Sequence, residues 1–286
     1  MTHYVPAGAS PDDVWLITGC SSGFGKALAT ALLAKGQRVA ATARNITALD
    51  YLGPESPQLL KLPLDVTNRA EVNAAFLVAR KQFGRVDVVV NNAGIGVIGP
   101  VEDMTEAQIR QQFEVNVFGV FNVTRAAQPL FREQQRGLFV NFASMAGEVS
   151  VPSLGVYSAS KFAVEGLSEA VRQEMEPYGV GVIVVEPGPF DTEWIGNNAV
   201  WAEETERYPG VWGYVTQMKA AYADRKIVGD PAKAAAAILK AAAMEPPPFR
   251  LALHEVSAEA TRGKFKSVIA DLDRTEGLTK DVHYAD

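Results

Sequence analysis

Short apolar runs alternate with longer segments of helical periodicity along most of the chain. Six runs predict strands, several of them apolar on both faces: 14–18, 38–43, 59–64, 86–90, 138–142 and 181–185. Strands of that kind belong to a parallel sheet covered by helices on each side. The segments between them predict the covering helices: 24–35, 68–83, 106–134, 157–176 and 230–243. An edge strand is expected at 249–253, with a last helix to about residue 274. The pattern predicts an α/β fold built on a doubly wound parallel sheet.

Between residues 187 and 229 this alternation gives way to a stretch bounded by proline and glycine and rich in aromatic residues: Phe190, Trp194, Trp201, Tyr208, Trp212, Tyr214 and Tyr222. Disordered segments are poor in aromatic residues, so we predict a substrate-binding loop or lid. No composition shift marks a domain boundary. We therefore expect a flexible N-terminal extension at 1–10, a single domain at 11–275 and a C-terminal tail at 276–286.

The composition of the chain excludes several classes of binding partner and indicates the cellular compartment. The net charge is −6 and basic residues are dispersed, which argues against binding nucleic acid or an anionic membrane surface. One cysteine, Cys20, excludes an internal disulfide, and three scattered histidines predict no metal site. Residues 1–13 lack the pattern of a signal peptide, and no apolar run is long enough to span a bilayer. We expect a cytoplasmic protein.

A glycine-rich loop, from Thr18 to Gly25, follows the first predicted strand and opens the first helix. Glycines let a backbone approach a pyrophosphate, and a helix N-terminus offers N–H groups and the positive end of a dipole. A strand, such a loop and a helix in succession are the context of a dinucleotide site. Cys20 is interpreted as a small filler. The residues expected to contact a dinucleotide are Thr18, Gly19, Ser21, Ser22, Gly23, Phe24 and Gly25.

The second predicted strand ends in Thr42-Ala43-Arg44-Asn45, where dinucleotide folds usually place an acidic residue against the adenosine ribose. No carboxylate stands there to repel a 2′-phosphate, and Arg44 is placed to bind one. Charge-assisted hydrogen bonds of about 1.5–3 kcal/mol would favour NADP(H) roughly tenfold to a hundredfold. The prediction is that NADP(H) is preferred and NAD(H) possible.

Tyr157 and Lys161 lie four residues apart in a predicted helix, which puts a phenol and an ammonium on one face. An adjacent ammonium favours the phenolate, so Lys161 should depress the pKa of Tyr157. Tyr157 would then serve as general acid for carbonyl reduction and as base for alcohol oxidation. Ser144, at the exit of the fifth strand, would hold the substrate oxygen as charge develops on it.

Together these features resemble the short-chain dehydrogenase/reductase family over about residues 11–274. The matching residues are the loop 18–25, Asp65, Val66, the run Asn91 to Gly94, Asn116, Ser144, Tyr157, Lys161, Pro187, Gly188 and Thr192. Two departures are Phe24, where relatives carry a smaller aliphatic residue, and a lone serine in Phe142-Ala143-Ser144. The resemblance implies a Rossmann-like, seven-stranded doubly wound sheet in a single dinucleotide-binding catalytic domain.

The same resemblance implies roles for individual residues. Asp65 and Val66 would border the adenine, and the run that contains Asn91, Ala93 and Gly94 would back the cofactor. Pro187, Gly188 and Thr192 belong to the segment that would meet the nicotinamide carboxamide. Asn116 would hold a water that relays protons to Lys161. Lys161 would also bind the ribose, and Tyr157 is expected to contact the cofactor as well.

The residues that flank the predicted catalytic residues in the sequence are apolar and suit a bulky, uncharged carbonyl compound or its alcohol. They are Ile95, Val97, Ile98, Met145, Val149, Val151, Leu154, Phe190 and the lid tryptophans. The predicted helices 106–134 and 157–176 carry apolar residues over more of their circumference than packing on a sheet requires. This excess predicts a homodimer or homotetramer through these two helices, as the family forms.

Two other functions would share parts of this sequence pattern. A catalytically silent dinucleotide-binding sensor or scaffold would share the fold, but it has no reason to keep Asn116, Ser144, Tyr157 and Lys161 together. An epimerase or dehydratase of nucleotide sugars uses the same Tyr-x-x-x-Lys pair but usually needs a larger C-terminal substrate domain. The interpretation is an NADP(H)-preferring oxidoreductase, with the silent protein as the alternative.

Overall fold

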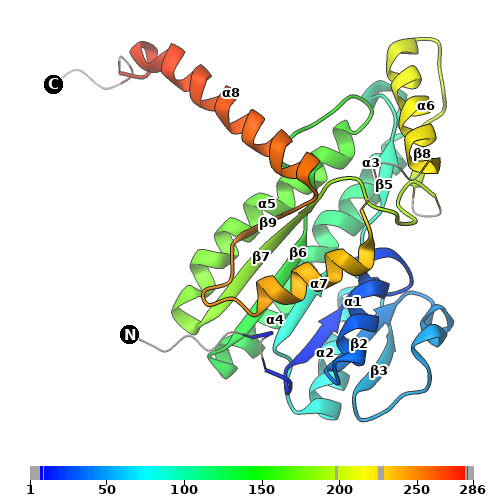
Figure 1. The fold of residues 1–286 in the computed structure, drawn as a ribbon, viewed down its shortest axis with the longest axis vertical. Coiled ribbons are helices and arrows are strands. Elements are labelled where there is room, and N and C mark those ends of the chain that lie inside the picture. Colours follow the sequence, from blue (N-terminus) through cyan, green and yellow to red (C-terminus); the bar gives the residue numbers. More distant parts are fainter. Residues whose placement is uncertain (1–6, 9, 197–198, 225–228, 281, 283–286) are drawn as a thin grey trace.

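A computed structural model of the chain describes residues 7, 8, 10–196, 199–224, 229–280 and 282. Its centre is one parallel sheet in the order β3-β2-β1-β4-β6-β7-β9 (Figure 1). All seven predicted strands are confirmed. Their bounds are β1 (Val14–Ile17), β2 (Arg38–Ala43), β3 (Leu59–Pro63), β4 (Val88–Asn91), β6 (Gly137–Phe142), β7 (Val180–Pro187) and β9 (Arg250–Leu253).

The strand order reverses beside β1, because the chain returns from β3 to place β4 on the other side of β1. In doubly wound sheets, ligands bind outside the carboxyl ends of the strands at this reversal. The loops after β1 and β4 are therefore the first place to look for a site.

Helices cover both faces of the sheet, as predicted. α1 (Gly23–Ala34) and α7 (Pro231–Ala242) pack on one face, against the layer that includes Ile17. On the other face lie α2 (Arg69–Phe83), α4 (Gly119–Gln134) and α5 (Gly155–Met175), against the layer that includes Leu16. Neighbouring residues of a strand point to opposite faces, which is why β1 is apolar throughout.

Helix ends follow their capping residues. Asn68 accepts from the backbone N–H groups of Ala70 and Glu71, and Asp230 accepts from that of Ala232, so α2 and α7 begin one residue later than predicted. The predicted helix 106–134 is α3 (Glu106–Phe113), a π-helical turn at Glu114–Phe118, and α4. The last helix, α8 (Glu255–Lys280), runs six residues past the predicted end.

The predicted lid has secondary structure that the sequence pattern did not indicate. β8 (Ala199–Trp201) pairs in parallel with β5 (Gly96–Ile98), and α6 (Pro209–Ala223) follows, with proline at its first position. Figure 1 shows β5, β8 and α6 together at one end of the molecule. A third apolar cluster, including Ile98, Leu154 and Trp212, holds this group to α5.

The predicted extension 1–10 lies largely outside the described residues, although Ala7 is buried in the core. Most of the predicted tail beyond Lys280 also lies outside them. Among the helices of the described residues, each is too short or too polar to cross a bilayer.

Candidate active site

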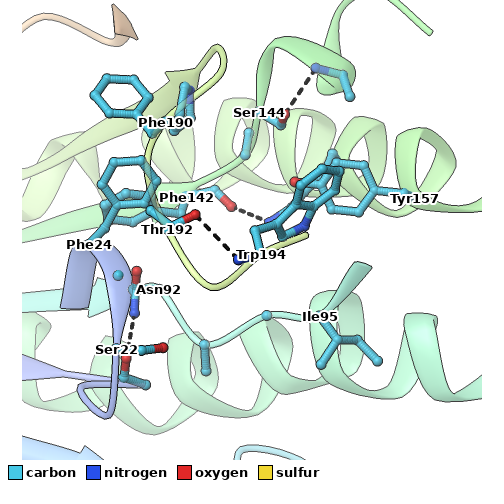
Figure 2. A pocket seen from close by; sticks show the side chains of 18 of the residues that line it. Ser22, Phe24, Asn92, Ile95, Phe142, Ser144, Tyr157, Phe190, Thr192 and Trp194 are labelled. Carbon is cyan, nitrogen blue, oxygen red and sulfur yellow. Dashed lines mark hydrogen bonds between the residues drawn. The ribbon is translucent and has the colours of Figure 1, made fainter. Parts of the chain in front are cut away.

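A cavity of 540 Å³ opens at the carboxyl ends of the strands, beside the reversal in strand order (Figure 2). The loops that follow β1, β4, β6 and β7 line this cavity, although they are distant from one another in the sequence. Most of the predicted site residues line it: Gly19, Ser21, Ser22, Gly23, Phe24, Arg44, Asp65, Val66, Ala93, Gly94, Ser144, Tyr157, Lys161, Pro187, Gly188 and Thr192.

The β1–α1 loop depends on its glycines. Gly19 and Gly23 have φ of 72° and 54°, in the left-handed region that favours glycine. A Cβ at Gly25 would lie 2.4 Å from the carbonyl oxygen of Gly19, so a side chain there would push α1 off the loop. The first turn of α1, which is described throughout, carries no acidic residue. This loop and helix end fit the phosphates of a dinucleotide.

Thr18 holds the loop in place rather than lining the cavity. Its hydroxyl donates to the Val90 carbonyl oxygen at 3.1 Å and accepts from the N–H groups of Asn92 and Ala93, each at 3.0 Å. The Asn92 amide in turn donates to the carbonyl oxygens of Thr18 at 2.8 Å and Gly19 at 2.9 Å. Asn92 lines the cavity and was absent from the predicted site residues, although its place in the Asn-Asn-Ala-Gly run marked it.

Asn91 and Asn116 lie behind the cavity wall. The Asn91 amide donates to Oδ1 of Asn141 at 2.8 Å, and Asn141 donates to Ser168 on α5 at 2.9 Å, which ties β4, β6 and α5 together. Asn116, in the π-helical turn, accepts from the N–H of Ile95 at 2.9 Å and donates to its carbonyl oxygen at 3.0 Å. Both asparagines fix the backbone that forms the wall.

Tyr157 and Lys161 are both buried on α5 and face the cavity. Nζ of Lys161 donates to the Phe142 carbonyl oxygen at 2.7 Å and lies 5.7 Å from the centroid of the Tyr157 ring. Ser144 follows β6, and its hydroxyl accepts from the N–H of Ala146 at 3.1 Å. A strand end and a helix thus bring a hydroxyl, a phenol and an ammonium into one cavity (Figure 2).

Burial controls the protonation of these groups. It lowers the pKa of Lys161 to about 8, although the nearby carboxylate of Glu165 raises it in part. Burial also raises the pKa of Tyr157, with Ser144 acting in the opposite direction. The sequence led us to expect that Lys161 would depress the pKa of Tyr157. In the chain by itself burial outweighs the ammonium, which lies over the ring and donates to a carbonyl.

The adenosine end of the cavity is formed by the loops after β2 and β3. Arg44 is exposed there, directly after the buried Ala43. Oδ1 of Asp65 accepts from both the N–H and the hydroxyl of Thr67, at 2.9 and 2.8 Å. Val66 packs so closely on α4 that a Cβ at Gly119 would lie 2.6 Å from its side chain. This end of the cavity can accommodate a ribose and an adenine, with the guanidinium of Arg44 beside them.

Phe24, one of the departures from the family pattern, packs against two other aromatic rings. The ring of Phe24 lies 5.3 Å from that of Phe142 and 5.0 Å from that of Phe190, measured between centroids. The larger residue in the glycine-rich loop is therefore packed between β6 and the segment after β7 (Figure 2).

The substrate side of the cavity is apolar and aromatic. The Trp194 ring lies against that of Tyr157 with 5.0 Å between centroids (Figure 2). Ile95, Met145, Val151, Leu154 and Phe190 line the cavity as predicted, whereas Val97, Ile98 and Trp212 form the buried cluster behind it. The sequence did not single out the residues that α6 adds besides Tyr214 and Tyr222, which are Gln217, Met218 and Ala221.

Comparison with known proteins agrees with this geometry. The sequence profile of the family described as short chain dehydrogenase matches residues 13–202. The oxidoreductase calM of Penicillium decumbens is 36% identical over 97% of this chain and 96% of that protein. The 3-ketodihydrosphingosine reductase of Bacteroides thetaiotaomicron is 37% identical over 82% of this chain and 85% of that protein.

Solved structures share the fold and contain cofactors of two kinds. A short-chain dehydrogenase from Streptomyces avermitilis superimposes with a TM-score of 0.87 and 40% identity, covering 95% of this chain and all of that one. Enzymes from Burkholderia cenocepacia, in complex with NADP, and Burkholderia phymatum, in complex with NAD, give TM-scores of 0.72 and 0.76. Their identities are 27% and 25%, over 93% and 95% of this chain and 98% and 97% of those chains. The chain belongs to the short-chain dehydrogenase family of NAD(P)-dependent oxidoreductases.

Proposed function

We propose that this enzyme prefers NADP(H) and interconverts a bulky, mostly apolar carbonyl compound and its secondary alcohol. The observation that carries the proposal is that Tyr157, Lys161 and Ser144 open into the same cavity as the glycine-rich loop. A dinucleotide on that loop supplies or accepts the hydride. The side chains around it have the remaining tasks of holding the substrate and moving a proton.

Tyr157 acts as the general acid in carbonyl reduction and as the base in alcohol oxidation. Its raised pKa keeps the phenol protonated near neutrality, which suits proton donation. Ser144 holds the substrate oxygen while charge develops on it. Lys161 binds the ribose and stabilises the phenolate electrostatically. Asn116 supports the relay of a proton to Lys161, since a Cβ at Gly94 would lie within 4 Å of both their polar ends.

Arg44 supports the preference for NADP(H). It is exposed at the adenosine end of the cavity, and Ala43 stands where a carboxylate would exclude a 2′-phosphate. The cofactor contacts are the predicted ones, with Thr18, Gly25 and Asn91 acting through the backbone they hold. NAD(H) remains a possible weaker cofactor.

The lining supports an apolar substrate. Trp194, Leu154 and Met218 present large apolar surfaces to the side of the cavity beyond Tyr157. One relative bears the name of a reductase of 3-ketodihydrosphingosine, a ketone, which agrees with a bulky carbonyl substrate. Residues 187–229 act as the lid over this side, although residues 197–198 and 225–228 of this range lie outside the described residues.

A homodimer or homotetramer through α3–α4 and α5 also belongs to the proposal. Phe118, Phe121 and Phe162 of these helices are exposed, whereas Val164 and Val171 of α5 are buried against the sheet. Large apolar side chains grouped on one face mark an interaction surface. The cytoplasm remains our expectation for its location, with which the buried free thiol of Cys20 agrees.

The test is oxidation of NADPH, followed by loss of its absorbance, with aliphatic, aromatic and steroid-like ketones in parallel with NADH. We expect turnover of at least one bulky ketone, faster with NADPH at equal cofactor concentration. Binding of NADPH with no turnover of any ketone in the panel would instead favour the silent sensor or scaffold.

A further inference from the structure

Within the described part of the chain, the last helix, α8, packs on the rest of the molecule mainly through its first two turns. Ser257 is buried and donates to the Glu186 carbonyl oxygen at 2.8 Å, whereas nearly all the side chains of α8 after Thr261 are exposed. Figure 1 shows α8 extending away from the sheet toward the C-terminus. Helices in proteins draw most of their stability from packing an apolar face, so a helix of this length needs a surface to pack on.

The exposed part of α8 has such a face. Phe265, Val268, Ile269 and Leu272 follow the spacing i, i+3, i+4, i+7 and share one side of the helix. Phe265 is 44%, Ile269 57% and Leu272 61% exposed. The four positions are symmetric about the midpoint between Val268 and Ile269, because Phe265 precedes that point by as many residues as Leu272 follows it. When a second copy of the helix lies antiparallel to the first, apolar residues of one copy therefore face apolar residues of the other.

The charges that flank this face are antisymmetric about the same midpoint. Lys264 and Lys266 precede it, and Asp273 and Asp271 follow it at the matching distances. Asp271 also pairs with Arg274 in its own helix at 2.6 Å. Reversing the helix thus exchanges basic positions for acidic ones, which is what a helix complementary to itself requires.

We propose that α8 of one copy packs antiparallel on α8 of a second copy, about a twofold axis that passes between Val268 and Ile269. Such an interface is isologous, so each contact occurs twice. Helical geometry puts Lys264 and Asp271 on one flank and Lys266 and Asp273 on the other. Across the axis, Lys264 of one copy meets Asp271 of the other, and Lys266 meets Asp273, each with an offset of about 3 Å along the helix.

The balance of charge favours a second copy over a membrane surface. Helices that lie on membranes carry an excess of basic residues on their polar face. α8 has five basic residues, Arg262, Lys264, Lys266, Arg274 and Lys280, and five acidic ones, Glu255, Glu259, Asp271, Asp273 and Glu276. The α8 contact is separate from the one proposed through α3–α4 and α5, and the two contacts together give a tetramer when their twofold axes intersect at right angles.

The test uses charge reversal in the full-length chain. We would measure molar mass by sedimentation velocity for wild type, for Lys264→Glu with Lys266→Glu, and for Asp271→Lys with Asp273→Lys. In each double variant like charges meet across the axis, so the mass is expected to fall to half that of wild type. An equal mixture of the two double variants pairs an all-acidic flank with an all-basic one and is expected to recover the wild-type mass.

An apolar variant and its control complete the test. Ile269→Asp places a carboxylate beside the axis and should halve the mass, while Ser267→Asp on the opposite side of α8 should leave it unchanged. Circular dichroism verifies that each variant keeps its helix content. The proposal is overturned if wild type is monomeric, if Ile269→Asp keeps the wild-type mass, or if the mixed double variants stay at half of it.

Discussion

The choice between two cofactors rests on two adjacent side chains at the end of β2. Ala43→Asp combined with Arg44→Ala removes an attraction for a 2′-phosphate and installs a repulsion. The ratio of kcat/KM for NADPH to that for NADH should fall by at least about a hundredfold, because each change contributes at least about tenfold. The measurement is steady-state kinetics with both cofactors at one saturating ketone concentration. A wild type that prefers NADH, or a ratio that moves less than about fivefold, would mean that Arg44 does not bind the phosphate.

Lys161 should set the alkaline limit of carbonyl reduction. Its pKa of about 8 means that the ammonium is lost as the pH rises through 8, whereas Tyr157 stays protonated because burial raises its pKa. We therefore expect kcat/KM for ketone reduction to decline above about pH 8, while circular dichroism shows that the enzyme remains folded.

Lys161→Met serves as the comparison, since methionine keeps the length of the side chain without the charge. It should weaken cofactor binding, lower the rate and abolish the decline between pH 7.5 and 9.5. The assignment is wrong if the wild-type profile is flat over that range, or if both enzymes decline alike.

At the scale of residues, the sequence predicted the groups whose chemistry is local. Tyr157 and Lys161 are one helical turn apart, and the spacing of the glycines in the β1–α1 loop is recognisable in the sequence. It could not show that burial dominates the pKa of Tyr157, because that burial comes from residues distant in sequence, among them Trp194 and Trp212. Nor could it separate Ala93, which lines the cavity, from Asn91, whose side chain points to β6.

At the scale of elements, the edge strand β9 is held by an unusual charge cluster. Arg250 donates to Glu165 and Glu186, each at 2.8 Å, to Glu169 at 2.9 Å, and also to Glu148. One guanidinium thus serves four carboxylates from α5, β7 and the turn after β6. Burial, together with the neighbouring carboxylates, raises the pKa of Glu165 to about 8, and burial also raises that of Glu186.

Arg250→Met should therefore destabilise the fold by on the order of 3 kcal/mol, because it leaves buried carboxylates without their cation. The loss should be larger at pH 8 than at pH 6. A carboxyl whose pKa is raised on folding binds its proton more tightly in the folded state, so stability falls as the pH rises from 4.5 toward 8. Removal of Arg250 raises these pKa values further and steepens that fall.

Urea denaturation at the two pH values measures the effect, with Arg125→Met on the exposed side of α4 as control. This account of the cluster is contradicted if both variants lose the same free energy of unfolding, or if the loss in Arg250→Met does not change with pH.

Helices and strands that are long and regularly patterned could be predicted from the sequence, whereas the shortest ones could not. The seven strands of the sheet were predicted because they are apolar and bounded by turn residues, and β9 was correctly placed at an edge. The strands β5 and β8 have three residues each and pair with each other across about a hundred positions, which no local pattern reveals. The π-helical turn at Glu114–Phe118 was equally invisible, because it differs from an α-helix by a single extra residue.

At the scale of the whole molecule, function follows from where the chain reverses the strand order. The β1–α1 loop and the loop after β4 form the side of the cavity suited to a dinucleotide, and Trp194 and α6 line the side suited to an apolar substrate. Tyr157 lies where these sides meet, with Ser144 on the neighbouring strand end (Figure 2). The fold class and the position of the cavity were predictable since both follow strand order, whereas the contribution of α6 to the cavity arises from packing distant in sequence.

Replacement of Tyr157 by phenylalanine tests this account most directly, because it removes one hydroxyl and keeps the ring that packs on Trp194. With a ketone that the wild type reduces, kcat should fall by at least about a hundredfold. Binding of NADPH, titrated separately by fluorescence, should change by less than about threefold, because the phenol is expected to be one cofactor contact among many and its main role is proton transfer. Near-normal turnover in Tyr157→Phe would contradict the assignment of this cavity as a site of tyrosine-assisted hydride transfer.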